Sequence, residues 1–184
     1  MSQTHKTNRI ILYAFFAALT AVCSWISIPL PFSPVPINLA TLSVFLAGGL
    51  LGASGGAVSQ IVFVFLGAVG LPVFHSFTGG IGILAGPTGG YLIGYITTAY
   101  LTGRLLGAPL GNKKPPLLMG AGKLALALLS CYVLGTAWFM FLTGTGLMAA
   151  LFLCVFPFLP GDALKIIAAL LLIRKLSPHL GRQI

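Results

Sequence analysis

The stretch PFLPGDALKIIAALLLIRKL, from Pro157 to Leu176, combines two features that seldom occur together. It is strongly apolar, yet it contains Asp162, the only acidic residue in a chain of 184, and Lys165 follows three positions later. Proline suits the first turn of a helix and cannot continue a helix interior, so the sequence predicts a helix that begins near Pro160. A carboxylate beside a lysine in such a helix is typical of a membrane span that carries a function.

The composition of the whole chain indicates a membrane protein. Hydrophobic residues make up 58% of the chain, charged residues make up 6%, and the mean hydropathy is +1.06. A soluble domain carries about a quarter of its residues as Asp, Glu, Lys or Arg, so this surface must face a lipid bilayer. The net charge of +9 does not indicate nucleic acid, because the basic residues lie at the edges of apolar segments. The three cysteines and three histidines are scattered, so we predict no metal site and no cofactor.

Apolar segments long enough to cross a bilayer, which takes about 20 residues, recur along the chain. The N-terminal segment is longer than the roughly 7–15 residues of a signal-peptide core, so it is predicted to be a retained first span. The prolines of the segment 147–175 predict a short outer helix or re-entrant piece before the last span. We therefore predict an all-α, polytopic integral membrane protein with six transmembrane helices and structured outer loops, forming one domain over 1–184. The six spans are expected near 10–28, 37–54, 56–74, 87–107, 117–142 and 160–175.

Small residues recur at intervals of four, a spacing that lets helix backbones approach closely in membranes. Each of two glycine sets is expected to line one helix face. The sets are Gly48, Gly52 and Gly56, and Gly86, Gly90 and Gly94. Ala14 and Ala18 form a similar smooth stripe on the first helix.

The positions of Lys and Arg predict the orientation in the membrane. The outer connections 29–36, 75–86 and 143–146 contain neither residue. Short loops on the cytoplasmic side of a membrane are rich in Lys and Arg. The chain is therefore predicted to lie in the cell membrane with both termini in the cytoplasm. The residues assigned to the cytoplasmic side are Lys6, Arg9, Arg104, Lys113, Lys114, Lys123, Arg174, Lys175 and Arg182.

Two outer connections are rich in residues that shape the backbone. PLPFSPVP, at 29–36, is expected to follow a stiff, extended path because of its prolines. HSFTGGIGILAGPTGGY, at 75–91, contains glycines that allow positive φ and a close approach of main chain to a ligand. Neither loop has the GxxxxGK[ST] pattern of a nucleotide-binding loop, so the chain is not expected to hydrolyse ATP by itself.

Asp162 and Lys165 are neighbours on one helix face, and two interpretations of the pair are open. The pair is either a helix-end charge or part of a ligand site. The helix dipole would stabilise a carboxylate by about 0.3–1 kcal/mol, whereas a charge within the membrane costs at least about 2.5–3.5 kcal/mol, which favours a site in a wet cavity. Such a site would accept adjacent N–H groups and donate to a carbonyl, as a urea or amide requires. An apolar ligand body would suit Phe32, Phe74, Phe77 and Tyr91.

Four motifs together closely resemble the BioY family, over nearly the whole chain and in the same order. The motifs are PFSPVPINLATLSVFLAGGLLGASGG at 31–56, GLPVF at 70–74, GGIGILAGPTGGYLIGY at 79–95 and PFLPGDALK at 157–165. The family comprises the biotin-binding (S) components of energy-coupling-factor (ECF) transporters. The resemblance implies six helices, cytoplasmic termini and a biotin pocket at the outer face. It also implies partners: a transmembrane coupling subunit, the T component, and two cytoplasmic ATPases.

The resemblance also implies roles for particular residues. The ligand-binding residues it implies are Asp162, Lys165, Gly79, Gly80, Ser76, Phe77 and Tyr91. Ala14 and Ala18 match the small-residue surface that docks the coupling subunit. The chain departs from the common family pattern at the segment 38–41, which reads NLAT, and at His75, where the family often has a small residue.

Two other functions are weighed against a transport subunit that is not an enzyme. An integral-membrane enzyme could use Asp162 as an acid or base on an amide or urea-like substrate. It would need a second polar catalytic group at membrane depth, and Lys165 alone is evident. A small channel gated by the glycine-rich loop would need polar residues along a continuous path, and the inner halves of the spans offer few.

Overall fold

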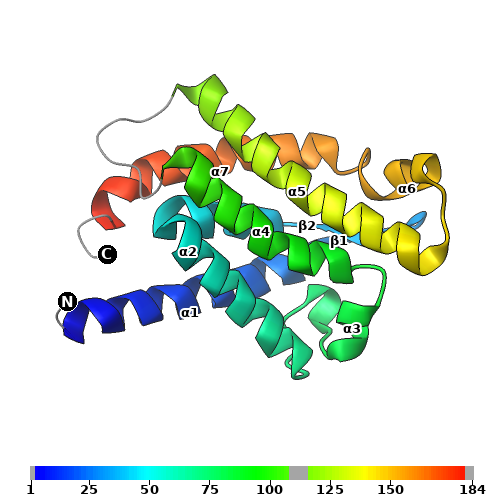
Figure 1. Ribbon diagram of the computed structural model, residues 1–184, viewed down its shortest axis with the longest axis horizontal. Coiled ribbons are helices and arrows are strands. Elements are labelled where there is room, and N and C mark those ends of the chain that lie inside the picture. Colours follow the sequence, from blue (N-terminus) through cyan, green and yellow to red (C-terminus); the bar gives the residue numbers. More distant parts are fainter. Residues whose placement is uncertain (1–2, 108–115, 181–184) are drawn as a thin grey trace.

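The computed structural model describes residues 3–107 and 116–180, which form a bundle of helices (Figure 1). Lys113, Lys114 and Arg182 of the charge map lie outside the described residues. The all-α class is confirmed, with one small β-hairpin added. The elements are α1 (Gln3–Trp25), β1 (Ser27–Leu30), β2 (Ser33–Asn38), α2 (Ala40–Ala68), the 3-10 turn η1 (His75–Phe77), α3 (Ile81–Ala85), α4 (Gly89–Leu106), α5 (Leu117–Thr143), α6 (Leu147–Cys154) and α7 (Leu159–Leu180).

Three of the described helices are long and apolar enough to cross a membrane by themselves. They comprise Lys6–Trp25, Ala40–Ala68 and Leu117–Thr143. A fourth span results if α6 and the part of α7 up to Pro178 count as one span, bent by 53° at its break. This bend lies where the prolines before α7 predict an interruption. The count of six spans remains a prediction.

Helix α2 contains a reversal of the chain at Gly52, whose backbone adopts φ 80° and ψ 179°. Glycine reaches this conformation readily because it has no Cβ. In a continuous helix Gly48 and Gly56 would lie about 12 Å apart, at 1.5 Å per residue. Instead, a Cβ built on Gly56 would lie 2.7 Å from the Cα of Gly48. The two halves of α2 therefore fold back on one another, as the adjacent predicted spans require (Figure 1).

The reversal corrects one expectation about the glycines. Gly48, Gly52 and Gly56 do not line one helix face, because Gly52 ends the first half of α2. In the second set, Gly94 packs on α5, where an added Cβ would lie 2.9 Å from the Cα of Cys131. Close contact between helices at small residues is therefore real, but at Gly48 and Gly56 it joins the two halves of a hairpin.

The proline-rich connection is extended, as expected, and its two halves pair as a β-hairpin that sequence reasoning did not predict. Strand β1 pairs antiparallel with β2, with Ser27 opposite Asn38 and Leu30 opposite Ser33. Each strand of a two-stranded sheet has a free edge, which is where proline is tolerated. Directly after the hairpin, the Leu39 N–H donates to the Cys23 carbonyl of α1 at 3.2 Å. The hairpin is thereby held against the end of α1.

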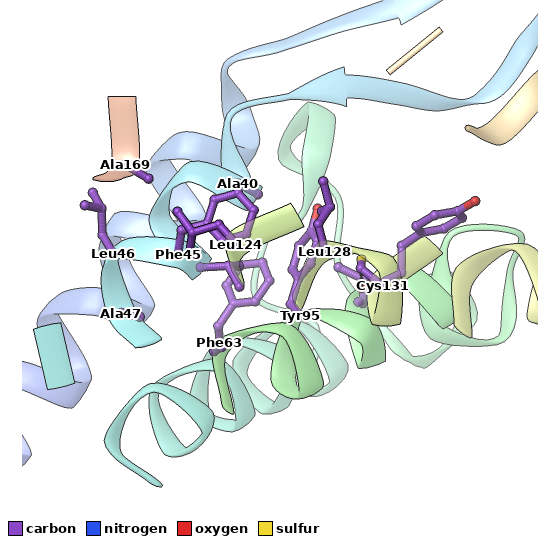
Figure 2. Packing of buried hydrophobic residues seen from close by; sticks show 14 of the residues in the cluster. Ala40, Phe45, Leu46, Ala47, Phe63, Tyr95, Leu124, Leu128, Cys131 and Ala169 are labelled. Carbon is purple, nitrogen blue, oxygen red and sulfur yellow. Dashed lines mark hydrogen bonds between the residues drawn. The ribbon is translucent and has the colours of Figure 1, made fainter. Parts of the chain in front are cut away.

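The core lies between α2, α4, α5 and α7. Figure 2 shows Phe45, Phe63 and Leu124 side by side, with Tyr95 next to them. Phe45, Phe63 and Leu124 are fully buried, and the rings of Phe63 and Tyr95 lie 6.4 Å apart between α2 and α4. Tyr95 extends from this apolar core toward the polar part of the molecule described below.

The two ends of the bundle differ in the elements they contain. Figure 1 shows the start of α1 and the end of α7 at one end, and the β-hairpin, α3 and α6 at the other. Lys6 and Arg9 lie in the first part of α1, Arg104 lies in the last turn of α4, and Arg174 lies in the second half of α7. These four basic residues therefore gather at the end opposite the β-hairpin, whereas Lys165, near the start of α7, lies in the cavity wall described below. This end is called the basic end below, and the other the loop end.

Candidate ligand-binding site

A cavity lies between the β-hairpin, the turn η1 and helices α1, α2, α4, α5, α6 and α7. Its volume is about 50 Å³, well below the roughly 300–1,000 Å³ typical of small-molecule pockets, so its walls lie close together in this structure. Of the predicted site residues, Asp162, Lys165 and Tyr91 line it. The structure thus brings together residues that are far apart in the chain.

The Asp162 carboxylate is buried and holds three hydrogen-bond donors. Lys165 Nζ donates to its Oδ1 at 2.8 Å, and Thr41 Oγ1 of α2 donates to the same oxygen at 3.3 Å. The Tyr132 hydroxyl of α5 donates to Oδ2. Asp162 is 4% exposed and Lys165 is 7% exposed. A buried charge is stable only when paired and hydrogen-bonded, and this carboxylate meets both conditions.

The start of α7 explains where the pair lies. The Asp162 N–H donates to the Phe158 carbonyl at 2.9 Å, so the first turn forms directly after the bend from α6. Asp162 is the acid of that first turn, where the helix dipole favours negative charge. Lys165 follows on the same helix face, and its Nζ donates to Oδ1 of Asp162. The two interpretations do not exclude one another, because the acid of the first turn of α7 also lines the cavity.

Several polar wall residues were missed by sequence reasoning. Besides Thr41 and Tyr132, the cavity is lined by Asn38 of β2 and Tyr95 of α4. Asn38 Oδ1 also accepts the Ala40 N–H at 3.1 Å, which fixes the start of α2. A tyrosine in the middle of an apolar span, as in LLSCYVLG at 128–135, is the signal that could have indicated Tyr132.

Tyr91, at the start of α4, forms part of the wall through its ring. Its hydroxyl lies 3.2 Å from Thr136 Oγ1 and donates to the Cys154 carbonyl at 3.3 Å. These contacts join α4 to α5 and α6. Because the hydroxyl already has partners within the protein, Tyr91 offers a ligand an apolar surface more readily than a hydrogen bond.

Four other residues of the implied ligand set do not line the cavity, and neither do Phe32 and Phe74, which were suggested for an apolar ligand body. Ser76 and Phe77 are exposed, and the Phe77 ring stacks on Trp25 of α1 with centroids 4.9 Å apart. The Gly80 N–H donates to the Gly67 carbonyl at 2.6 Å, and Gly79 lies so close to the Leu71 carbonyl that a Cβ would overlap it. From this loop it is His75 that lines the cavity.

Two tryptophans hold the outer loops in place. Trp25 Nε1 donates to the Pro72 carbonyl at 2.9 Å, and Trp138 Nε1 of α5 donates to the Gly86 carbonyl at 2.9 Å. Each indole therefore joins a helix to a loop that follows α2 or precedes α4. The loops are folded back onto the bundle, as their glycine and apolar content indicates.

Ala14 and Ala18 lie away from the cavity, on the exposed side of α1. They line a shallow apolar groove between α1 and α2, together with Val62 and Leu66 of α2. Their neighbour Ala17 is buried against α2. The stripe therefore presents small side chains to the surroundings, close to where another helix could approach.

These features define a class: a helical membrane protein with a small-molecule pocket at its loop end. Within residues 3–107 and 116–180, no group of three or more His, Cys, Asp or Glu side chains gathers. The family model described as the BioY family matches residues 1–182. The chain belongs to the BioY family.

Similar proteins agree with this assignment over nearly their whole length. The biotin transporter BioY of Rhodobacter capsulatus is 35% identical over 94% of each chain. The biotin transporter BioY of Rhizobium etli is 34% identical over 91% of each chain. The crystal structure of the S-component for biotin from an ECF-type ABC transporter matches with a TM-score of 0.86 and 29% identity, covering 97% of this chain and 95% of that chain.

Proposed function

We propose that this protein binds biotin at its loop end and is the substrate-binding subunit of an ECF-type uptake transporter. The observation that carries the proposal is the single carboxylate of the chain, Asp162, buried beside Lys165 in the wall of the cavity. The relatives reported above are named as biotin transporters and none of them as an enzyme.

Biotin fits the chemistry of this wall. Its ureido ring offers two N–H donors beside a carbonyl, and an ionised carboxylate is an acceptor with two oxygens. Asp162 would accept the ureido N–H groups, displacing or sharing its bonds with Thr41 and Tyr132. Lys165 is already bonded to Asp162 at 2.8 Å and would hold the carboxylate in orientation or donate to the ureido carbonyl. The rings of Tyr91 and Tyr95 would enclose the apolar part of biotin.

Energy for uptake would come from partners. The chain has no nucleotide-binding loop pattern, so a transmembrane coupling subunit and two cytoplasmic ATPases would supply ATP hydrolysis. The groove at Ala14 and Ala18 is the proposed contact for the coupling subunit. The protein would lie in the cell membrane with both termini in the cytoplasm, the loop end facing outward.

The test is a titration of the purified, detergent-solubilised protein with biotin. Saturable, stoichiometric binding without turnover is expected. The substitution Asp162→Asn places an amide N–H against a ureido N–H of biotin. Losing a hydrogen bond to a charged group costs about 1.5–3 kcal/mol, and leaving a buried donor unpaired costs about 1–3 kcal/mol more. The variant should therefore bind at least about tenfold, and up to about a thousandfold, more weakly.

Thermal melting checks that the Asp162→Asn protein is folded. A folded variant that binds biotin as tightly as the parent would remove Asp162 from the site. Chemical conversion of the ligand would favour the membrane enzyme, and a biotin-independent current in planar bilayers would favour the channel.

A further inference from the structure

His75 is a second cavity-lining residue that can carry positive charge, and it stands apart from the ion pair. It follows Phe74, whose side chain is fully buried, and it is itself half-buried. The ion pair recorded at the cavity joins Lys165 to Asp162. Burial alone lowers the pKa of His75, with no contribution from either member of that pair.

The backbone around His75 is held in one conformation. Both the Thr78 hydroxyl and the Thr78 N–H donate to the His75 carbonyl, at 2.8 and 3.2 Å, and the Phe74 N–H donates to the Thr78 carbonyl at 2.9 Å. Ser76 and Phe77 have positive φ values of 54° and 57°. Non-glycine residues in this region are strained, and such strain is concentrated at ligand clamps and active sites. The turn fixes the backbone from which the imidazole projects before a ligand arrives.

The charged groups of the cavity wall described so far do not account for binding of a ligand carboxylate. The positive charge of Lys165 is matched by Asp162 at 2.8 Å, so the pair as a whole offers little net attraction to a second carboxylate. Biotin carries a carboxylate at the end of its side chain, opposite the ureido ring. Among the described residues that line the cavity, His75 is the remaining side chain that can become positive.

We propose that His75 recognises the carboxylate end of the ligand and makes this pocket select the free acid over neutral derivatives. This inference rests on the proposed function, because it assigns the second end of the same ligand. The imidazole would donate a charge-assisted hydrogen bond to the carboxylate, the stronger kind of hydrogen bond in proteins.

The role implies a defined pH dependence. In the empty protein the pKa of His75 lies below its ordinary value of about 6.5, and a bound carboxylate would raise it. Binding therefore takes up a proton, and affinity for biotin should rise as the pH falls from 7.5 to 5.5. A ligand carboxyl stays ionised there, since such groups titrate near pH 4.3. The other titratable groups facing the cavity are Tyr91 and Tyr95 of α4, Cys131 and Tyr132 of α5, Cys154 of α6, and the pair on α7.

The experiment compares biotin with its neutral primary amide at pH 5.5 and pH 7.5. The parent protein should prefer biotin by about tenfold to a hundredfold at pH 5.5, and by clearly less at pH 7.5. His75→Gln, which keeps a neutral donor, should bind the amide as the parent does and lose the preference. His75→Lys should keep the preference at both pH values. Thermal melting verifies the fold of each variant.

The outcomes separate this inference from the function on which it rests. A parent protein that binds biotin and the amide equally at pH 5.5 overturns the role of His75 and leaves biotin binding intact. A His75→Gln protein that retains the full preference for biotin over the amide also overturns the role of His75. That result would assign carboxylate recognition to Lys165. A parent protein that binds neither compound overturns the proposed function itself.

Discussion

Asp162 receives its hydrogen bonds from three different helices, since Thr41 belongs to α2, Tyr132 to α5 and Lys165 to α7. A group with partners on several elements orients all of them, and removing one partner leaves the others poorly satisfied. The carboxylate therefore has a structural part in the empty protein as well as its proposed part in binding.

Tyr132 is a residue at which both parts can be tested in one variant. In Tyr132→Phe the ring stays in the wall, but Asp162 loses a donor. Removing one hydrogen bond to a charged group costs about 1.5–3 kcal/mol. We expect the affinity for biotin to fall by about tenfold or more and the melting temperature to fall as well. Both are measured on the same detergent preparation.

Tyr100→Phe is the matched control, because Tyr100 lies exposed on α4 and lines no part of the cavity. Affinity and melting temperature should match the parent within error. If Tyr132→Phe also behaves like the parent, the hydroxyl is dispensable and the donor set of Asp162 must be redrawn.

At the scale of elements, the packing of α2 on α4 depends on the absence of a side chain at Gly48. In Gly48→Ala the new Cβ would lie 2.8 Å from the Thr102 Cβ of α4 and closer still to the Ala99 carbonyl. Overpacking of this kind costs about 1–3 kcal/mol. The melting temperature should drop clearly. Gly122→Ala in α5, where nothing lies within 4 Å, should not lower it; equal melting of the two variants would contradict the close contact.

The exposed stripe on α1 carries a different prediction. Replacing Ala14 and Ala18 with Leu fills the groove between α1 and α2 and holds another helix at a distance. We expect the double variant to lose co-purification with the coupling subunit and energised uptake, while biotin binding to the isolated protein persists. Ala125→Leu, an equally exposed change on α5, serves as control. Loss of binding in the isolated double variant would instead assign the stripe to the fold or the pocket.

The sequence predicted the elements of this site unevenly. A buried charge is costly, so Asp162 and Lys165 could be singled out from one chain without coordinates. Thr41 and Tyr132 could not, because hydroxyl residues are common in membrane helices and their partners depend on packing in three dimensions. At Gly52 the outcome is mixed: the adjacent spans 37–54 and 56–74 already required a turn between them, but the spacing of the glycines suggested one helix face, which the backbone angles of Gly52 exclude.

For the whole molecule, the charge map and the fold lead to one orientation. The start of α1 and the end of α7 lie together at the basic end (Figure 1). Residues of β2, η1 and α6, which belong to the loop end, line the cavity. A reporter fused after residue 180 should be found on the cytoplasmic side. A reporter inserted near Thr78 should be found outside. A C-terminus outside the cell would contradict the six-span topology.

The two tryptophans of the chain, Trp25 and Trp138, both sit at the loop end, each bonded to a loop carbonyl. The tryptophan fluorescence of the protein therefore comes from this end alone. Trp25 is also stacked on Phe77, two residues from His75, so its emission is sensitive to any displacement of that turn. If ligand binding displaces this turn, the tryptophan fluorescence of the unlabelled protein should change when ligand is mixed in.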